Sequence, residues 1–373
     1  MTPDIDVVVV GAGLTGTATA WALSRAGHSV VLFDAYGFGH DKGSSHGTSR
    51  IFRRIYPDDL YVGMTGRAQE GWRELESESG TTLLRVRGGI DHGRSRNPEA
   101  LAAVAARHQL GYELLSASEA QERWPGMVFD GPVLFQPDAG VVDADASIAA
   151  FLDVARRNGA RLVPNTPVET IEVGDEHVVV HAGEAVRARR VVLAAGGWLP
   201  ELVETCRLDI PLPHLQITQQ QVFHFRQRDP QAVFPVLVHK DRHQIFGLPS
   251  GADGGPRPAM KVARHDGGIP TTAGTRSGTI DPAGRRLITD YVNQWLPALD
   301  PEPVAEGTCL YTMTDDDDFV LDRRGPVVVA SPCSGHGAKF APLLGGMIAD
   351  LALGRAERHP RFALDRELPR VAL

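Results

Sequence analysis

The hydrophobic pattern at the N-terminus predicts a strand, a glycine turn, a helix and a second strand. An apolar run from Asp6 to Val10 leads into a GxGxxG motif, and a helical segment then leads into a second apolar run that stops before Asp34. A βαβ dinucleotide-binding unit requires this order of elements. We therefore expect a Rossmann-like unit at the start of the chain.

Each residue of this motif has a separate physical role. Gly11 allows the tight turn, Gly13 lets the backbone approach a pyrophosphate, and Gly16 lets the helix lie close to the strand. The helix N-terminus offers free N–H groups to the phosphates. A carboxylate at position 34 can accept hydrogen bonds from both ribose hydroxyls and disfavours a 2′-phosphate, so FAD or NAD is expected before NADP. The residues predicted to bind the cofactor here are Gly11, Ala12, Gly13, Leu14, Thr15, Gly16, Asp34 and Ala35.

The α/β pattern is interrupted after Asp34 and returns from Asp145. A loop rich in glycine, serine and histidine follows Asp34, and a helical stretch runs from Met64 to Glu78. The run from Leu84 to Gly93 predicts a strand of a different region. The remaining predicted elements up to residue 197 are helices at Pro98–His108, Ala117–Arg123 and Asp145–Asn158, strands at Arg161–Val163 and near Val168 and Val178, and a strand ending at Gly196 and Gly197.

Residues 212–314 are typical of an antiparallel sheet. Long β-rich runs cover Ile217–Phe225, Val236–Leu248 and Met260–Ala263, with a helix at Arg285–Leu296. The last segment again predicts a strand, a glycine loop and a helix. The expected fold is α/β (α+β), a Rossmann-like nucleotide-binding domain interleaved with an antiparallel-sheet substrate domain. The pieces are 1–83, 145–211 and 315–373 for the first domain, and 84–144 and 212–314 for the second.

Composition narrows the function. The chain has 373 residues and a net charge of −8, with no basic block, which argues against nucleic acid or an anionic membrane as partner. Three cysteines make no disulfide framework, so a reducing compartment is expected. The first strand begins too early for a signal peptide, and no apolar run is long enough to span a membrane. The expected location is the cytoplasm.

Four stretches carry a family resemblance. Residues 43–56 (GSSHGTSRIFRRIY), 258–265 (PAMKVARH), 309–322 (CLYTMTDDDDFVLD) and 334–340 (SGHGAKF) occur in this order after the dinucleotide unit. Together they resemble the monomeric sarcosine oxidase and N-methyltryptophan oxidase family of flavoproteins. The resemblance spans nearly the whole chain and implies FAD as the cofactor.

The resemblance changes the interpretation of Cys309. From the sequence alone, a single cysteine at the end of a strand is more often a small buried hydrophobe. In the family, the cysteine of a C-x-Y-T-x-T-x-D-x-x-F pattern carries the flavin through a thioether. Cys309 begins such a pattern here, so covalent FAD at Cys309 is expected, while Cys206 and Cys333 are expected to be structural. The aspartates of residues 315–318 lack the spacing of a calcium loop and predict a solvated acidic turn, and no metal site is expected.

The resemblance also assigns cations to the active site. Residues matching Arg53 and Lys339 bind the substrate carboxylate, and a guanidinium with an ammonium suits that purpose. A residue matching Lys261 lies against the flavin on the face opposite the substrate and promotes reaction with oxygen. The further residues expected near the flavin or the substrate are Ser44, His46, Ser49, Arg50, Val168, Gly196, His265, Gly335, His336 and Gly337.

Two positions depart from the family pattern. Aligning residues 234–250 places Val238 and Ile245 where sarcosine oxidases carry a methionine and a tyrosine near the substrate. We expect a more aliphatic pocket that need not prefer sarcosine. The expected function is an FAD-dependent, monomeric oxidase of secondary amino acids, using O2 and forming hydrogen peroxide. The alternatives are a secondary amino-acid dehydrogenase that passes electrons to a carrier, and a non-catalytic flavin-binding subunit.

Overall fold

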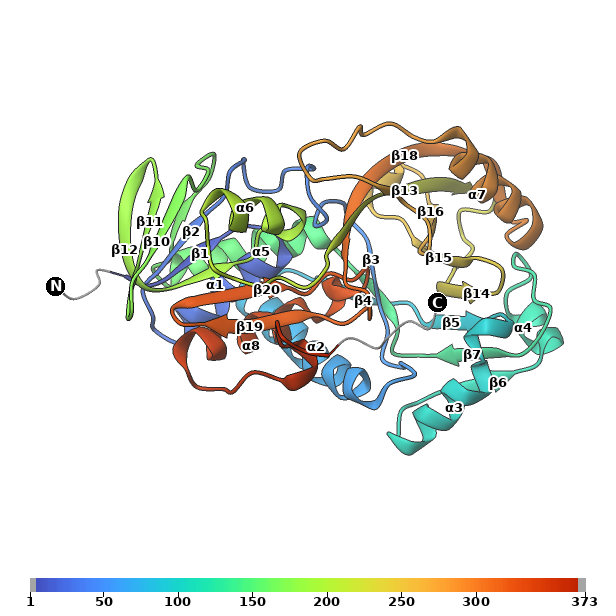
Figure 1. The fold of residues 1–373 in the computed structure, drawn as a ribbon. Coiled ribbons are helices and arrows are strands. Elements are labelled where there is room, and N and C mark those ends of the chain that lie inside the picture. The colour runs from blue at the N-terminus through green and yellow to red at the C-terminus, as the bar shows by residue number, and fades with distance from the viewer. Residues whose placement is uncertain (1–4, 368–373) are drawn as a thin grey trace.

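Two large sheets and a small one organise the chain. The structure is a computed structural model and describes residues 5–367. An eight-stranded mixed sheet occupies one half of the molecule and a nine-stranded sheet the other (Figure 1). A third sheet has three strands. The two halves of the chain interleave, because each large sheet takes strands from well-separated segments.

The first sheet contains the predicted dinucleotide unit. Its parallel centre is β12–β1–β2–β9. The first part of β12 also pairs with β11, which pairs with β10, and the last part of β12 pairs with β20, which pairs with β19. The strands are β1 (Ile5–Val10), β2 (Val30–Phe33), β9 (Arg161–Val163), β10 (Thr170–Val173), β11 (Val178–Ala182), β12 (Glu184–Leu193), β19 (Val320–Arg324) and β20 (Val327–Ser331).

Alternation along β1 builds a core on each face of this sheet. Val7 and Val9 face one cluster, and Val8 and Val10 face the other, as a strand covered on both sides requires. The first cluster lies under helices α1 (Leu14–Arg25), α2 (Asp59–Ser79), α5 (Ala144–Arg157) and α8 (Ala341–Leu353). The second cluster includes α6 (Leu199–Thr205).

The second sheet is mostly antiparallel. Its order is β17–β13–β16–β15–β14–β5–β7–β6. A ninth strand, β18, also pairs with β13 and lies off this path. The strands are β5 (Gly89–His92), β6 (Glu113–Leu115), β7 (Val133–Gln136), β13 (Gln216–Gln227), β14 (Val236–Lys240), β15 (Gln244–Pro249), β16 (Ala259–Arg264), β17 (Ile269–Pro270) and β18 (Leu299–Met313). Helix α7 (Pro282–Trp295) packs through Ile288 and Val292 on a core with Phe223 and Phe225 of β13.

Smaller elements connect these parts. The three-stranded sheet joins β3 (Arg50–Phe52), β8 (Gly140–Val142) and β4 (Leu84–Val86). Helices α3 (Pro98–Arg107) and α4 (Ala117–Arg123) lie near β5, β6 and β7 (Figure 1). The short 3-10 turns are η1 (Arg94–Arg96), η2 (Gly196–Trp198), η3 (Ala252–Gly254), η4 (Gly337–Phe340) and η5 (Pro360–Phe362). None of the helices in residues 5–367 has the length and apolarity needed to cross a bilayer.

Most predicted elements are confirmed, and one is wrong. The predicted strand from Leu84 to Gly93 is two strands in different sheets, because Gly88 takes a positive φ of 72° and turns the chain from β4 into β5. The short strand expected near Val168 is β10, which begins at Thr170.

The predicted solvated acidic turn is partly wrong, because Asp315 and Asp317 are exposed whereas Asp316 and Asp318 are not. The Asp316 carboxylate pairs with the Arg366 guanidinium at 2.7 Å, and these side chains are only 8% and 5% exposed. Asp318 accepts hydrogen bonds from Tyr61 at 2.7 Å and from Arg361 at 2.5 Å. These carboxylates therefore fasten the C-terminal segment to the turn before β19. Within residues 5–367 no cluster of three or more potential metal ligands is found.

Replacing Arg366 with methionine should destabilise the protein strongly, because it leaves the Asp316 carboxylate buried without its cation. Removing one partner of a buried pair costs roughly 3–5 kcal/mol. Urea unfolding at pH 7 measures the change. Arg107→Met, which removes an exposed cation paired with the exposed Asp59, should leave the midpoint nearly unchanged. Equal midpoints for both variants would contradict a structural role for the Arg366 pair.

Candidate active site

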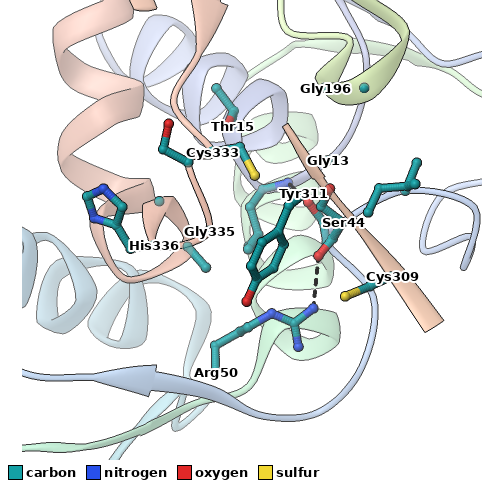
Figure 2. A pocket seen from close by; sticks show the side chains of 18 of the residues that line it. Gly13, Thr15, Ser44, Arg50, Gly196, Cys309, Tyr311, Cys333, Gly335 and His336 are labelled. Atoms are coloured by element: carbon teal, nitrogen blue, oxygen red, sulfur yellow. Dashed lines mark hydrogen bonds between the residues drawn. The ribbon is translucent and has the colours of Figure 1, made fainter. Parts of the chain in front are cut away.

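A single large cavity lies where the two large sheets meet. Its volume is about 890 Å³, and its wall runs from the glycine turn after β1 to the strands of the second sheet. Figure 2 shows part of this wall, with Gly13, Thr15, Arg50, Cys309 and His336 arranged around one space. A cavity this long, starting at a dinucleotide turn, suits an extended cofactor with substrate room beyond it.

Steric constraints explain the glycines of the turn. Gly11 has φ of +101°, and a Cβ there would lie 2.5 Å from the Ala194 carbonyl oxygen of the neighbouring strand end. A Cβ on Gly16 would collide with the Gly11 carbonyl. Gly16 does not line the cavity. The close contact with Gly11 agrees with the packing role predicted for Gly16, since helix α1 must approach β1 closely.

Asp34 holds the turn in place. Its carboxylate accepts hydrogen bonds from the backbone N–H of Ala12 at 2.6 Å and of Tyr36 at 2.8 Å, while the side chain is 6% exposed. It also lines the cavity. A carboxylate oxygen can accept more than one hydrogen bond, so the residue can fix the glycine turn and still receive ribose hydroxyls.

The loop of residues 43–50 crosses over the helix N-terminus. Ser45 Oγ accepts a hydrogen bond from Leu14 N–H at 3.1 Å. The Arg50 guanidinium donates to the carbonyls of Ser44 at 2.9 Å and His46 at 2.6 Å, the first drawn in Figure 2. Arg50 therefore fixes the loop on which the other predicted residues lie.

Two polar atoms on this loop lack a partner among the described residues. His46 Nε2 and Ser49 Oγ are buried without a hydrogen bond, and both residues line the cavity. An unsatisfied buried polar atom costs free energy unless a ligand completes it. Burial and the cation Arg50 lower the pKa of His46 to about 4, so this ring is neutral. The loop fits a ligand with hydrogen-bonding edges, as a flavin ring has.

Cys309 lies on the cavity face of β18. Its register partner is Gln220 on β13, and both residues line the cavity. Burial raises the pKa of the Cys309 thiol, while Arg50 and Lys261 act in the opposite direction. Figure 2 shows the sulfur on the same side of the cavity as the Arg50 guanidinium. The other two cysteines are Cys206, buried under the first sheet, and Cys333, which also lines the cavity and whose Sγ accepts a hydrogen bond from the Thr312 backbone N–H of β18 at 3.4 Å.

Two cations and a tyrosine form a group on the wall of the cavity, in which Tyr56 and Lys339 are buried and Arg53 is half-buried. The Arg53 guanidinium stacks 3.9 Å from the Tyr56 ring centroid, and the Lys339 ammonium is 5.7 Å from it. Lys339 Nζ donates to the His336 carbonyl at 2.7 Å. Burial would raise the pKa of the Tyr56 phenol, but Lys339 and Arg53 overcome that effect and lower it. The region therefore favours negative charge.

The predicted histidines are neutral here. Burial and nearby Lys339 hold the pKa of His336 well below its usual value. Burial, with Lys240, Lys339 and Arg53 around it, lowers the pKa of His265 to about 4. His336 Nε2 donates to the Asp317 carbonyl at 3.0 Å, which leaves Nδ1 as an acceptor facing the Tyr56 hydroxyl at 3.4 Å.

Lys261 lies in β16 with a carboxylate partner that the sequence did not indicate. Its ammonium donates to Asp253 Oδ2 at 2.6 Å, and its side chain is 5% exposed. Asp253 also accepts a hydrogen bond from Thr48 Oγ1 at 2.6 Å. Although burial would raise the pKa of Asp253, Lys261 and these bonds hold it well below its usual value. Asp253 joins the loop of residues 43–50 to the second sheet.

The β14–β15 hairpin presents one face to the cavity. Val238 pairs with Phe246, and His239 pairs with Ile245. Because side chains alternate, Val238 and Phe246 share the cavity face while Ile245 packs into the core with Phe223 and Met260. Ile245 also borders the cavity, as does Phe246, which the sequence did not single out.

The structure brings nearly all predicted residues to this one cavity. Apart from Gly16, the wall includes Gly11, Ala12, Gly13, Leu14, Thr15, Asp34, Ala35, Ser44, His46, Ser49, Arg50, Arg53, Val168, Gly196, Val238, Ile245, Lys261, His265, Cys309, Gly335, His336, Gly337 and Lys339. The sequence reasoning missed Tyr56, Lys240, Phe246 and Asp253. Tyr56 lay inside a quoted motif, whereas Asp253 lies in a loop without a local signal.

The cavity and the two sheets define a dinucleotide-binding flavoprotein fold. The FAD dependent oxidoreductase family profile matches residues 6–351. Monomeric sarcosine oxidase of Streptomyces avermitilis is 33% identical over 380 residues, which cover 96% of each chain. Peroxisomal sarcosine oxidase of Homo sapiens is 31% identical and covers 93% of this chain and 92% of its own. NikD, described as an unusual amino acid oxidase essential for nikkomycin biosynthesis, superposes in its open form with a TM-score of 0.87, 25% identity and full coverage of both chains.

The chain therefore belongs to the FAD-dependent oxidoreductase family. The resemblance to sarcosine oxidases that four motifs indicated is confirmed over almost the whole chain. FAD is the cofactor that this family and this cavity imply.

Proposed function

We propose that this protein is an FAD-dependent oxidase of secondary amino acids with N-methyl, N-alkyl or cyclic nitrogen. The observation that carries the proposal is a pair of cations in the cofactor cavity, half-buried Arg53 and buried Lys339, both of which lie near the Tyr56 ring. Bound FAD would accept a hydride from the carbon beside the substrate nitrogen and pass the two electrons to oxygen, giving hydrogen peroxide. The oxidised substrate is an imine, and water hydrolyses it to an amine and a carbonyl compound, which is formaldehyde for an N-methyl substrate.

The cations bind the carboxylate and select the reactive form of the amine. Arg53 is held by stacking on Tyr56 and by its hydrogen bond to the Ile55 carbonyl at 2.6 Å, so it is preorganised for a bidentate contact. Lys339 adds a second charge. Both cations repel an ammonium group, and a neutral amine is the form that can lose a hydride. His265 and His336, being neutral, do not oppose this selection.

Lys261 and Asp253 serve the second half of the reaction. We assign to Lys261 the fixed positive charge that favours electron transfer to oxygen, since preorganised charge stabilises charge that develops. Burial lowers the pKa of Lys261, and Asp253 opposes this by keeping the ammonium charged. Asp253 is thus a positioning residue. Its hydrogen bond to Thr48 also keeps the ammonium near the loop that would face the flavin.

The lining cysteine supports covalent attachment. Cys309 lines the cavity near Arg50 and Lys261. Burial raises the pKa of its thiol, and these two cations reduce that rise. We propose that Cys309 holds FAD through a thioether. The relatives described as monomeric support a monomer, and three unpaired cysteines support a reducing compartment, the cytoplasm.

Replacing Lys339 with methionine should weaken binding of the amino-acid substrate by roughly 10- to 1,000-fold, because a desolvated carboxylate loses a charged partner. Anaerobic stopped-flow reduction of the flavin by sarcosine, N-methyltryptophan, proline and pipecolate measures the substrate Kd. Arg54→Met is the control, since Arg54 pairs with Gln69 outside the cavity. An unchanged Kd in the Lys339 variant would refute carboxylate binding there. A flavin that no amine reduces would instead favour a non-catalytic subunit.

Replacing Asp253 with asparagine should shift the pH dependence of reoxidation by oxygen. Without the carboxylate, the pKa of Lys261 falls further. As the pH rises, the ammonium therefore loses its proton at a lower pH than in the wild type, and the reoxidation rate decreases at that lower pH. The rate of anaerobic reduction should change little. Double-mixing stopped-flow measures both steps from pH 6 to 10. An unchanged oxygen profile in Asp253→Asn would exclude the positioning role. If Lys261→Met leaves reoxidation unaffected, a dehydrogenase becomes the better assignment.

Replacing Cys309 with alanine should release the flavin. Yellow colour should stay with acid-precipitated wild-type protein and move to the supernatant of the variant. Cys333→Ala tests the specificity, since Cys333 lines the same cavity, and it should retain the colour in the pellet. Release of all colour from the wild type would rule out a covalent linkage.

A further inference from the structure

Lysine is rare in this chain and concentrated in the cavity. The sequence has four lysines, Lys42, Lys240, Lys261 and Lys339, against 34 arginines. Three of the four line the cavity, Lys42 being the exception. Lys261 and Lys339 already have proposed roles. Lys240 has none, although the chain otherwise uses arginine for most of its cations.

The strand register aims Lys240 at the substrate side. Lys240 is the last residue of β14 and pairs with Gln244, on the same face as Val238 and Phe246. The same face continues through Ala263, which pairs with Phe246, to His265, whose N–H bonds the Gln244 carbonyl. Lys240 is therefore part of the wall that bounds the substrate space beside His265.

The ammonium of Lys240 has no partner among the described residues. The Lys240 side chain is partly buried. Neighbouring charges act on its pKa, but none of the described residues forms a hydrogen bond with its ammonium. Burial, with Arg96 and Arg53 nearby, lowers its pKa to about 8. A group with this pKa is still largely charged at pH 7, so an anion would bind there favourably.

The charges around the substrate space leave one cation uncompensated. Arg96 is neutralised by buried Asp91 at 2.5 Å, and both histidines are neutral. Arg53, Lys339 and Lys240 remain as cations, and Asp317 at the rim is the one carboxylate that acts on Lys240 without a partner of its own. A substrate α-carboxylate and Asp317 together balance two of the three charges.

We propose that Lys240 binds a second anionic group, a carboxylate on the side chain of the amino-acid substrate. The preferred substrate class is then an N-alkylated dicarboxylic amino acid, with its α-carboxylate on Arg53 and Lys339. This inference rests on the proposed function, because it takes the α-carboxylate site as given. An ammonium is a compact point charge and does not require a bidentate geometry. Lys240 can therefore bind the carboxylate of substrate side chains of different lengths.

The test compares acids with their neutral isosteres. Flavin reduction in the holoenzyme is measured anaerobically with N-methylaspartate and N-methylglutamate, and with N-methylasparagine and N-methylglutamine as the matched amides. We expect the better acid to exceed its amide by roughly 10- to 100-fold in the limiting rate divided by Kd, which is the range of one charge-assisted contact. Lys240→Met should reduce this ratio to near one, and Lys240→Arg should retain part of it.

Arg242→Met provides the control. Arg242 is an exposed cation two residues further along the same hairpin and does not line the cavity, so its removal should leave the ratio unchanged. If amides react as well as acids, or if Lys240→Met keeps the preference, the inference is overturned. Reduction by sarcosine but by neither acid would overturn the inference and leave the proposed function intact. Reduction by none of these compounds or the cyclic amino acids would remove both.

Discussion

The positive charge gathered around one buried cavity is the constraint on which this site depends. Arg50, Arg53, Lys261 and Lys339 lie on its wall, and burial disfavours every additional charge of the same sign. His46 and His265 are accordingly neutral. The same field would exclude an ammonium and attract a carboxylate, so substrate orientation and amine protonation have a common electrostatic cause.

The protein compensates these cations unequally. Lys261 has Asp253 at 2.6 Å and Arg96 has Asp91, whereas Arg53 and Lys339 have backbone carbonyls and aromatic rings around them and no carboxylate partner among the described residues. Cations with a carboxylate partner are held in place, and cations without one remain available to an anionic ligand. This distinction separates a positioning network from a binding site within one cavity, and it identifies Lys240 as belonging with the second group.

The two large sheets contribute different parts of the cavity wall. The first sheet supplies the glycine turn and Asp34, which set the cofactor end of the cavity. The second sheet presents Cys309, Lys261, His265 and the β14–β15 hairpin on one face, because alternate residues of adjacent strands point the same way. The opposite face packs on α7, which keeps the strands in register. Membership of the FAD-dependent oxidoreductase family agrees with this arrangement.

The sequence alone determined the dinucleotide unit, the alternation of α/β and antiparallel regions, and many of the residues that line the cavity. It could do so because a GxGxxG turn, strand periodicity and four short motifs are local signals. Tertiary structure decided the rest. The Lys261–Asp253 pair joins β16 to the loop before it, the burial of Asp316 depends on Arg366 fifty residues away, and the cavity face of the β14–β15 hairpin depends on its register. A one-residue shift reverses the face of every side chain in a strand, and only the paired strands fix it.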